Sequence, residues 1–144
     1  MSTINNEAEF NLALNNLSAE QQRAVAAKFV ISVLPLTTDN RVQQVLQVSA
    51  NPDAAAAELE SARQTVRAAV IDGHTRCGAE CDWNDQAAYF VARAAQSALD
   101  DNAAWQAAMS SRMARNSAMI ASEDNSTNPE IAKQYDILNN YLSD

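Results

Sequence analysis

The chain is poor in the residues that build turns and sheets. Its 144 residues include two glycines and three prolines, and aromatic residues make up 6 % of the sequence. Hairpin turns rely on glycine and proline, and strands are enriched in β-branched and aromatic residues, so these shortages disfavour a sheet. Much of the 47 % hydrophobic content is alanine, which has the highest helix propensity. The composition therefore predicts an all-α fold.

Basic residues are also scarce. Ten lysines and arginines stand against 18 aspartates and glutamates, which gives a net charge of −8. Proteins that bind nucleic acid need a basic surface to displace counterions, so we expect no nucleic-acid partner. An acidic protein instead attracts a basic protein partner through long-range electrostatic steering.

Long apolar runs are missing as well. No segment approaches the roughly 18 consecutive apolar residues of a membrane span, so we expect no membrane partner. Residues 1–10 lack the basic region and the apolar run of a signal peptide. We therefore expect a cytoplasmic protein whose cysteines are reduced.

Capping signals divide the chain into six or seven helices. Ser18 and Gln21 form a capping box, and Asp39 is a good N-cap. Asn51-Pro52 and Asn128-Pro129 each place an asparagine cap before a proline at the first helical position. The predicted helices cover about 7–15, 18–33, 39–49, 52–72, 82–99, 103–121 and 129–142. Because short connections favour antiparallel neighbours, we predict one domain over 1–144, either a single bundle or a short solenoid-like stack.

The scarce residue types gather in residues 72–85. This stretch holds the only histidine, both cysteines, both glycines and one of the two tryptophans. Gly73 is placed to end the preceding helix as a left-handed residue, and Asp82 or Asn84 is placed to start the next. We therefore predict, first of all, an inter-helix joint at 72–85.

A metal site is one interpretation of this joint. His74, Cys77 and Cys81 follow the spacing H-x2-C-x3-C, and an imidazole with two thiolates is a ligand set for zinc. The fourth ligand of the tetrahedron could be Asp72, Glu80, Asp82 or water. Structural zinc sites usually show a second ligand pair, which this sequence lacks. We favour a capped turn with two small buried cysteines and no cofactor, and keep a metal-binding or sensory helical bundle as the alternative.

The joint shows no recognisable catalytic pattern. The spacing of Cys77 and Cys81 is longer than the C-x-x-C of thioredoxin-like sites, and no βαβ pattern surrounds it. A cysteine nucleophile paired with His74 lacks a local signature. The nearby carboxylates lie at predicted helix N-termini, where they interact favourably with the helix dipole. We predict no enzyme activity and no catalytic residue.

An acidic surface is the second interpretation of the joint, and it comprises Glu80, Asp82, Trp83 and Asp85. Tryptophan is enriched in interface hot spots, and charge governs the rate and specificity of encounter. These residues are therefore our predicted partner-binding site. The alternative is that the acids cap a helix and that Trp83 is a core residue at its start.

Several segments resemble a known family. Ala26-Ala27-Lys28-Phe29 leads to Val33-Leu34-Pro35-Leu36, and Asp39-Asn40-Arg41-Val42 then opens a helix. Ser61–Ala69 and Gln86–Ala95 are alanine-rich. Over about residues 26–120 these segments are similar to the helical immunity proteins of bacterial polymorphic toxin systems. The resemblance implies a non-enzymatic cytoplasmic protein that binds a cognate toxin and neutralises it by steric occlusion.

Overall fold

The computed structural model describes residues 3–51, 53–76, 83–99, 103–121 and 128–143. Within these ranges the chain forms seven α-helices, one short 3-10 helix and no strand, which confirms the all-α prediction. The elements are α1 (Glu7–Asn15), α2 (Ala19–Val33), η1 (Leu34–Leu36), α3 (Asn40–Ser49), α4 (Ala56–Arg76), α5 (Trp83–Ala98), α6 (Ala103–Ala121) and α7 (Pro129–Ser143). No helix in the described ranges is both long and apolar enough to cross a membrane.

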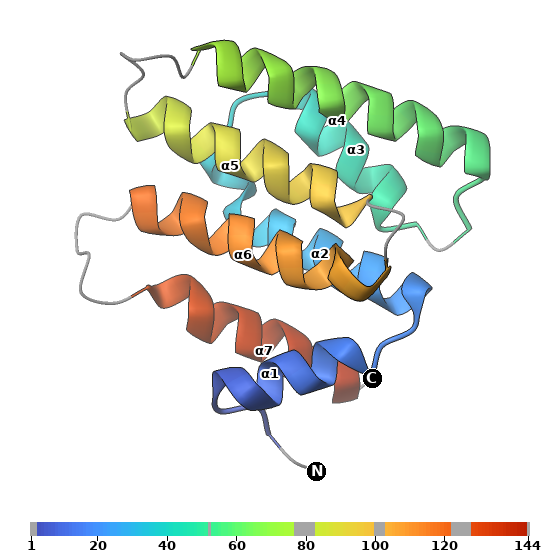
Figure 1. The fold of residues 1–144 in the computed structure, drawn as a ribbon, viewed down its shortest axis with the longest axis vertical. Coiled ribbons are helices and arrows are strands. Elements are labelled where there is room, and N and C mark those ends of the chain that lie inside the picture. Colours follow the sequence, from blue (N-terminus) through green and yellow to red (C-terminus); the bar gives the residue numbers. More distant parts are fainter. Residues whose placement is uncertain (1–2, 52, 77–82, 100–102, 122–127, 144) are drawn as a thin grey trace.

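Four helices form a row across the molecule. Figure 1 shows α4, α5, α6 and α7 in that order, with successive helices running in opposite directions. α5 and α6 form the most extensive helix pair, and α2 packs behind them and against α7. α3 packs against α4 and α5. α4 therefore lies at one edge of the fold, and α1 and α7 lie at the other (Figure 1).

Short polar side chains cap the N-termini of four helices, and three of these caps, Ser18, Asp39 and Asn128, were predicted from the sequence. Ser18 Oγ accepts a hydrogen bond from the Gln21 amide at 3.2 Å, and Gln21 Oε1 accepts one from the Ser18 amide at 2.9 Å. Asp39 and Asn128 likewise accept from backbone amides at the starts of α3 and α7. Asn6 caps α1. Each cap satisfies an amide that the helix leaves without a partner, so these boundaries are local properties of the sequence.

Both ends of α4 differ from the prediction. Asn51 caps a turn rather than the helix, because its Oδ1 accepts from the Asp53 amide at 2.9 Å and α4 begins only at Ala56. At the other end, α4 continues through Gly73 to Arg76. No glycine in the described ranges has a positive φ, so the prediction that Gly73 ends the helix was wrong. A β-carbon at Gly73 would lie 3.3 Å from Tyr89 Cδ1, so the glycine instead permits close approach of α5.

The core consists of two hydrophobic clusters. The larger lies among α2, α3, α4, α5 and α6, and the smaller lies where α1 and α7 meet α2. Many of the buried positions are alanine, which lets the helix axes approach closely. The largest side chains of the smaller cluster are Phe10, Leu14, Phe29 and Leu138.

Candidate functional site

The joint predicted at 72–85 is described in part. Asp72 and His74 lie in the last turns of α4, and Trp83 is the first residue of α5. Cys77, Glu80, Cys81 and Asp82 lie outside the described ranges, as does the side chain of Trp83. The predictions that rest on these residues therefore remain predictions. The neighbouring residues that the structure does describe lie at the end of α4, at the start of α3 and in the first turns of α5.

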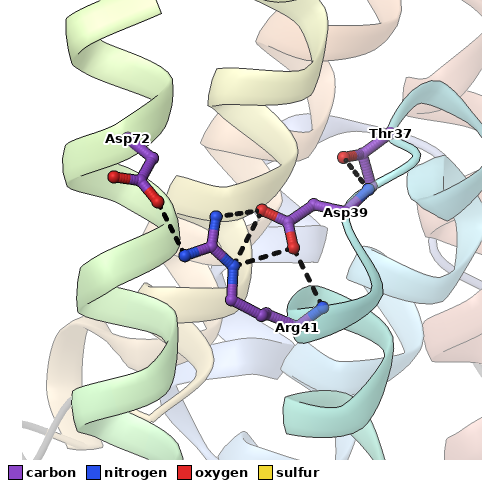
Figure 2. A network of polar contacts seen from close by, with 4 residues as sticks. All are labelled: Thr37, Asp39, Arg41 and Asp72. Carbon is purple, nitrogen blue, oxygen red and sulfur yellow. Dashed lines mark hydrogen bonds and ion pairs between the residues drawn. The ribbon is translucent and has the colours of Figure 1, made fainter.

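An arginine ties the start of α3 to the end of α4. Arg41 Nη1 lies 2.7 Å from Asp72 Oδ2, and Arg41 Nη2 lies 2.7 Å from Asp39 Oδ2. Arg41 Nε donates to both oxygens of Asp39, at 3.0 and 3.2 Å. Figure 2 shows the guanidinium between the two carboxylates, with the Thr37 hydroxyl accepting a hydrogen bond from the Asp39 amide. Asp39 thus caps α3 and binds its own Arg41 at the same time.

The charges of this network favour the ionised arginine. Hydrogen bonds to Asp39, and then to Asp72, raise the pKa of Arg41 further above its usual range. The side chains of Arg41 and Asp39 are partly buried, whereas that of Asp72 is more than half exposed. Charge-assisted hydrogen bonds are stronger than neutral ones, so the network fixes the last turns of α4 relative to α3.

A small cavity lies beside this network. Its volume of about 30 Å³ gives room for roughly two water molecules. The cavity is lined by Thr37, Asp39, Ala69, Gly73, Asp85, Ala88, Tyr89 and Ala92. Asp85, one of the predicted partner-binding residues, is half-buried and lines this space between α4, α5 and the segment before α3.

His74 is exposed near the end of α4, and its ring centroid lies 5.9 Å from that of Tyr89. Tyr89 also contacts Phe90, and the Arg93 guanidinium lies 5.7 Å from the Tyr89 ring centroid. Among the residues that the structure describes, no three His, Cys, Asp or Glu side chains gather as a metal site would require. Asp72, a predicted fourth ligand, is held by Arg41 instead. The zinc site on His74, Cys77 and Cys81 is neither confirmed nor contradicted, since both cysteines lie outside the described ranges.

The last turns of α4 also expose an isoleucine that the sequence did not single out. Ile71 is 54 % exposed and precedes Asp72 directly. Sequence periodicity could have found it, because Ile71 follows the buried Ala69 by two positions and so faces away from the core. Ile71 thus places an exposed apolar side chain beside the carboxylate that Arg41 holds.

A second polar cluster, the α6–α7 polar cluster, was missed by sequence reasoning. It consists of Glu7, Arg115, Glu130, Gln134 and Tyr135. Glu130 is only 2 % exposed, and Gln134 is completely buried. Gln134 Oε1 accepts from Arg115 Nε at 2.6 Å, and Glu7 accepts from both Arg115 Nη1 and the Tyr135 hydroxyl. Burial raises the pKa of Glu130, opposed by its hydrogen bond with Ser32 and the nearby positive charges.

A shallow groove opens between α3 and α4. Its volume is about 180 Å³, and it is lined by Gln44, Val45, Val48, Ser61, Ala62 and Thr65. The lining contains no charged side chain, and Thr65 Oγ1 already donates to the Ser61 carbonyl. The groove therefore offers few groups that could orient a polar ligand.

Comparison of the chain with protein-family models, with curated proteins and with solved structures finds no match.

Proposed function

We propose that the protein is a non-enzymatic protein-binding module that contacts a basic partner through the α4–α5 joint. This surface comprises the predicted Glu80, Asp82, Trp83 and Asp85, together with Ile71, Asp72 and His74. In this proposal the protein acts in the cytoplasm, with neither a nucleic acid nor a membrane as its partner.

The observation that carries the proposal is the exposure of Ile71 beside Asp72. Burial of the exposed part of an isoleucine in an interface contributes roughly 1 kcal/mol. Arg41 holds the carboxylate of Asp72, so little side-chain freedom would be lost there on binding. The apolar contact and the fixed charge thus lie together on a part of α4 that is already ordered.

The charge of the chain supports a basic partner. The net charge of −8 increases the encounter rate with a positively charged protein, and Glu80, Asp82 and Asp85 follow α4 directly in the sequence. The similarity of residues 26–120 to helical immunity proteins supports a toxin as that partner. Within this proposal, the protein neutralises the toxin by steric occlusion.

The proposal is tested with the product of a toxin gene adjacent to the gene of this protein. Co-expression of the two should restore growth, and the purified proteins should form a complex whose affinity falls as the salt concentration rises. The triple variant Asp82→Ala, Trp83→Ala, Asp85→Ala should weaken that complex and keep its helical circular dichroism. Adding Ile71→Ser should weaken it further.

A matched control removes the same kinds of side chain from other surfaces. Glu20→Ala, Asp136→Ala, Leu142→Ala deletes two exposed carboxylates and one exposed apolar side chain on α2 and α7. This variant should bind the partner as the unmodified protein does. Equal affinity of the two triple variants would show that the α4–α5 joint is not the contact surface.

The zinc content of the purified protein distinguishes the metal-binding alternative from the protein-binding proposal. If His74, Cys77 and Cys81 hold zinc, the purified protein should contain close to one equivalent of it, and Cys77→Ser should abolish that content. A metal-free protein that unfolds at the same temperature with and without added zinc would exclude this alternative.

A further inference from the structure

Two atoms of the α6–α7 polar cluster are buried without a hydrogen-bond partner. They are Glu130 Oε1 and Arg115 Nη2. In the described part of the chain, Arg115 Nη2 is the one buried side-chain nitrogen that lacks an acceptor. Leaving a buried polar atom unsatisfied costs about 1–3 kcal/mol, and more if the group is charged. Glu130 is only 2 % exposed and one of its oxygens has no donor, so its ionised form is disfavoured.

Arg115 is shared between the interior and the N-terminal helix. Its Nη1 lies 2.8 Å from Glu7 Oε1, in the first turn of α1, and its guanidinium lies over the Phe10 ring at 4.9 Å. The positive charge of Arg115 also acts on Glu130. One guanidinium therefore binds a carboxyl group on α1 and acts through its charge on another on α7.

We propose that Arg115 couples the ionisation of Glu130 to the docking of α1, so that α1 is held most firmly when Glu130 is neutral. Loss of the Glu130 proton creates a buried charge whose free oxygen needs a donor, and Arg115 Nη2 is the donor without an acceptor. Turning the guanidinium toward Glu130 lengthens its contact with Glu7. The contact that holds the first turn of α1 then weakens as the pH rises.

Three helices contribute polar or charged groups that act on the Glu130 carboxyl. α2 contributes the Ser32 hydroxyl, α6 contributes Arg115, and α7 contributes Lys133, whose Nζ lies 4.0 Å from Glu130 Oε2. Lys133 is largely exposed, so water and salt screen its charge. Burial and the hydrogen bond to Glu7 raise the pKa of Tyr135, so its phenol stays protonated throughout the range below.

The sign of the pH dependence follows from burial. Desolvation raises the pKa of Glu130, so the folded protein keeps this proton to a higher pH than the unfolded chain does. The docking of α1 is therefore complete at low pH and decreases as the pH rises through the Glu130 titration. The device is independent of the last turns of α4, because α4 lies at the other edge of the fold (Figure 1).

Amide hydrogen exchange of the full chain tests the coupling. Protection of α1 is compared with that of α3, after correction for intrinsic exchange, from about pH 5 to about pH 8. The ratio should fall about two- to fivefold across this range, the factor expected when a partly exposed ion pair is lost. Because a change in global stability alters the protection of both helices, it cancels in the ratio of α1 to α3.

Three variants assign the effect to named groups. Glu130→Gln keeps the size of the side chain and cannot ionise, so the ratio should no longer change with pH. Glu7→Gln removes the competing carboxylate and should also abolish the change. The control is Glu9→Gln in the same turn of α1, where Glu9 binds Asn5 and Asn6, and it should keep the change. A ratio that is flat in the unmodified protein, or that still falls in Glu130→Gln, overturns the proposal.

The reciprocal effect provides a second test that does not depend on the fold of a Glu130 variant. If one guanidinium interacts with both carboxyl groups, removing Glu7 must leave Arg115 free to move closer to Glu130 and stabilise its ionised form. The carboxyl carbon of Glu130, followed by NMR, should therefore titrate at a lower pH in Glu7→Gln than in the unmodified protein. The corresponding proton affinity should fall by the same factor of about two to five. An unchanged midpoint shows that the two carboxyl groups are not coupled.

Discussion

Arg41 and Asp72 lie 31 residues apart in the sequence, yet Nη1 of the arginine is 2.7 Å from Oδ2 of the aspartate. The same guanidinium binds Asp39, the N-cap of α3, so a single side chain joins the start of one helix to the end of another (Figure 2). Asp39 and Gly73 also line the small cavity beside the network. The stability of this corner of the fold can therefore be probed with few substitutions.

Arg41→Ala should lower the free energy of unfolding by about 1–2 kcal/mol, between the values for a surface ion pair and for a buried charge-assisted hydrogen bond. Urea denaturation measures this change. The exposed Arg67→Ala on α4 is the control and should stay within about 0.5 kcal/mol of the unmodified protein. Asp39→Asn should cost less than Asp39→Ala, because asparagine still caps α3. Equal losses for Arg41→Ala and Arg67→Ala would show that the network does not stabilise the fold.

Glu130→Gln should stabilise the protein at neutral pH. The unfolded pKa of a glutamate is about 4.3, and burial holds the folded pKa of Glu130 above its unfolded value. Its contribution to stability is therefore greatest below the unfolded pKa and is lost as the pH rises through the folded pKa. Replacing the carboxyl group by an amide should raise the free energy of unfolding at pH 7 by about 1 kcal/mol.

Urea denaturation at several pH values measures this gain, which should shrink as the pH falls toward the unfolded pKa. Glu58→Gln, on an exposed position of α4, should show no such dependence. A gain that is constant with pH would mean that the ionisation of Glu130 is not responsible for it.

The features predicted correctly depend on neighbours in sequence. The capping box of Ser18 and Gln21 involves residues only three positions apart. The start of α2 could therefore be predicted from the local sequence alone. The inward faces of α2 and α3 follow from helical spacing, and Val25, Phe29 and Val45 are buried as predicted.

The features that were missed depend on contacts between helices. Glu130 reads as a solvent-exposed acid in the first turn of α7, and only the packing of α7 on α2 and α6 buries it. Gly73 reads as a helix end, because glycine is the usual left-handed residue there. Its actual role is a close contact with Tyr89 of α5, a residue 16 positions away that no local pattern connects to it.

Gly73→Ala should raise the free energy of unfolding by about 0.5 kcal/mol. Alanine in a helix interior is better than glycine by nearly 1 kcal/mol. Part of that gain is offset because the new β-carbon would lie 3.3 Å from Tyr89 Cδ1, and the half-buried ring must move slightly. Thermal denaturation measures the change. Gly73→Val should instead destabilise the protein, and a loss in Gly73→Ala as large as that in Gly73→Val would mean that the Tyr89 ring cannot move.

Gln22 links three helices through its buried amide. Its Nε2 donates to the Leu14 carbonyl at 2.7 Å, and its Oε1 accepts from the Ala107 amide at 3.1 Å, so α2 holds the end of α1 and the start of α6. The side chain is only 3 % exposed, so water cannot replace these bonds readily. Gln22→Leu keeps the volume and removes both bonds.

We expect Gln22→Leu to lower the free energy of unfolding by about 2 kcal/mol, because it leaves polar backbone groups without their side-chain partner in the interior. Gln43→Leu, at an exposed position of α3, makes the same chemical change and should alter stability by less than about 0.5 kcal/mol. Chemical denaturation of both variants gives the difference. Gln22→Glu adds a further test, since it keeps an acceptor for the Ala107 amide but places a charge in the core. It should be the least stable of the three at neutral pH and should recover as the carboxyl group is protonated at lower pH.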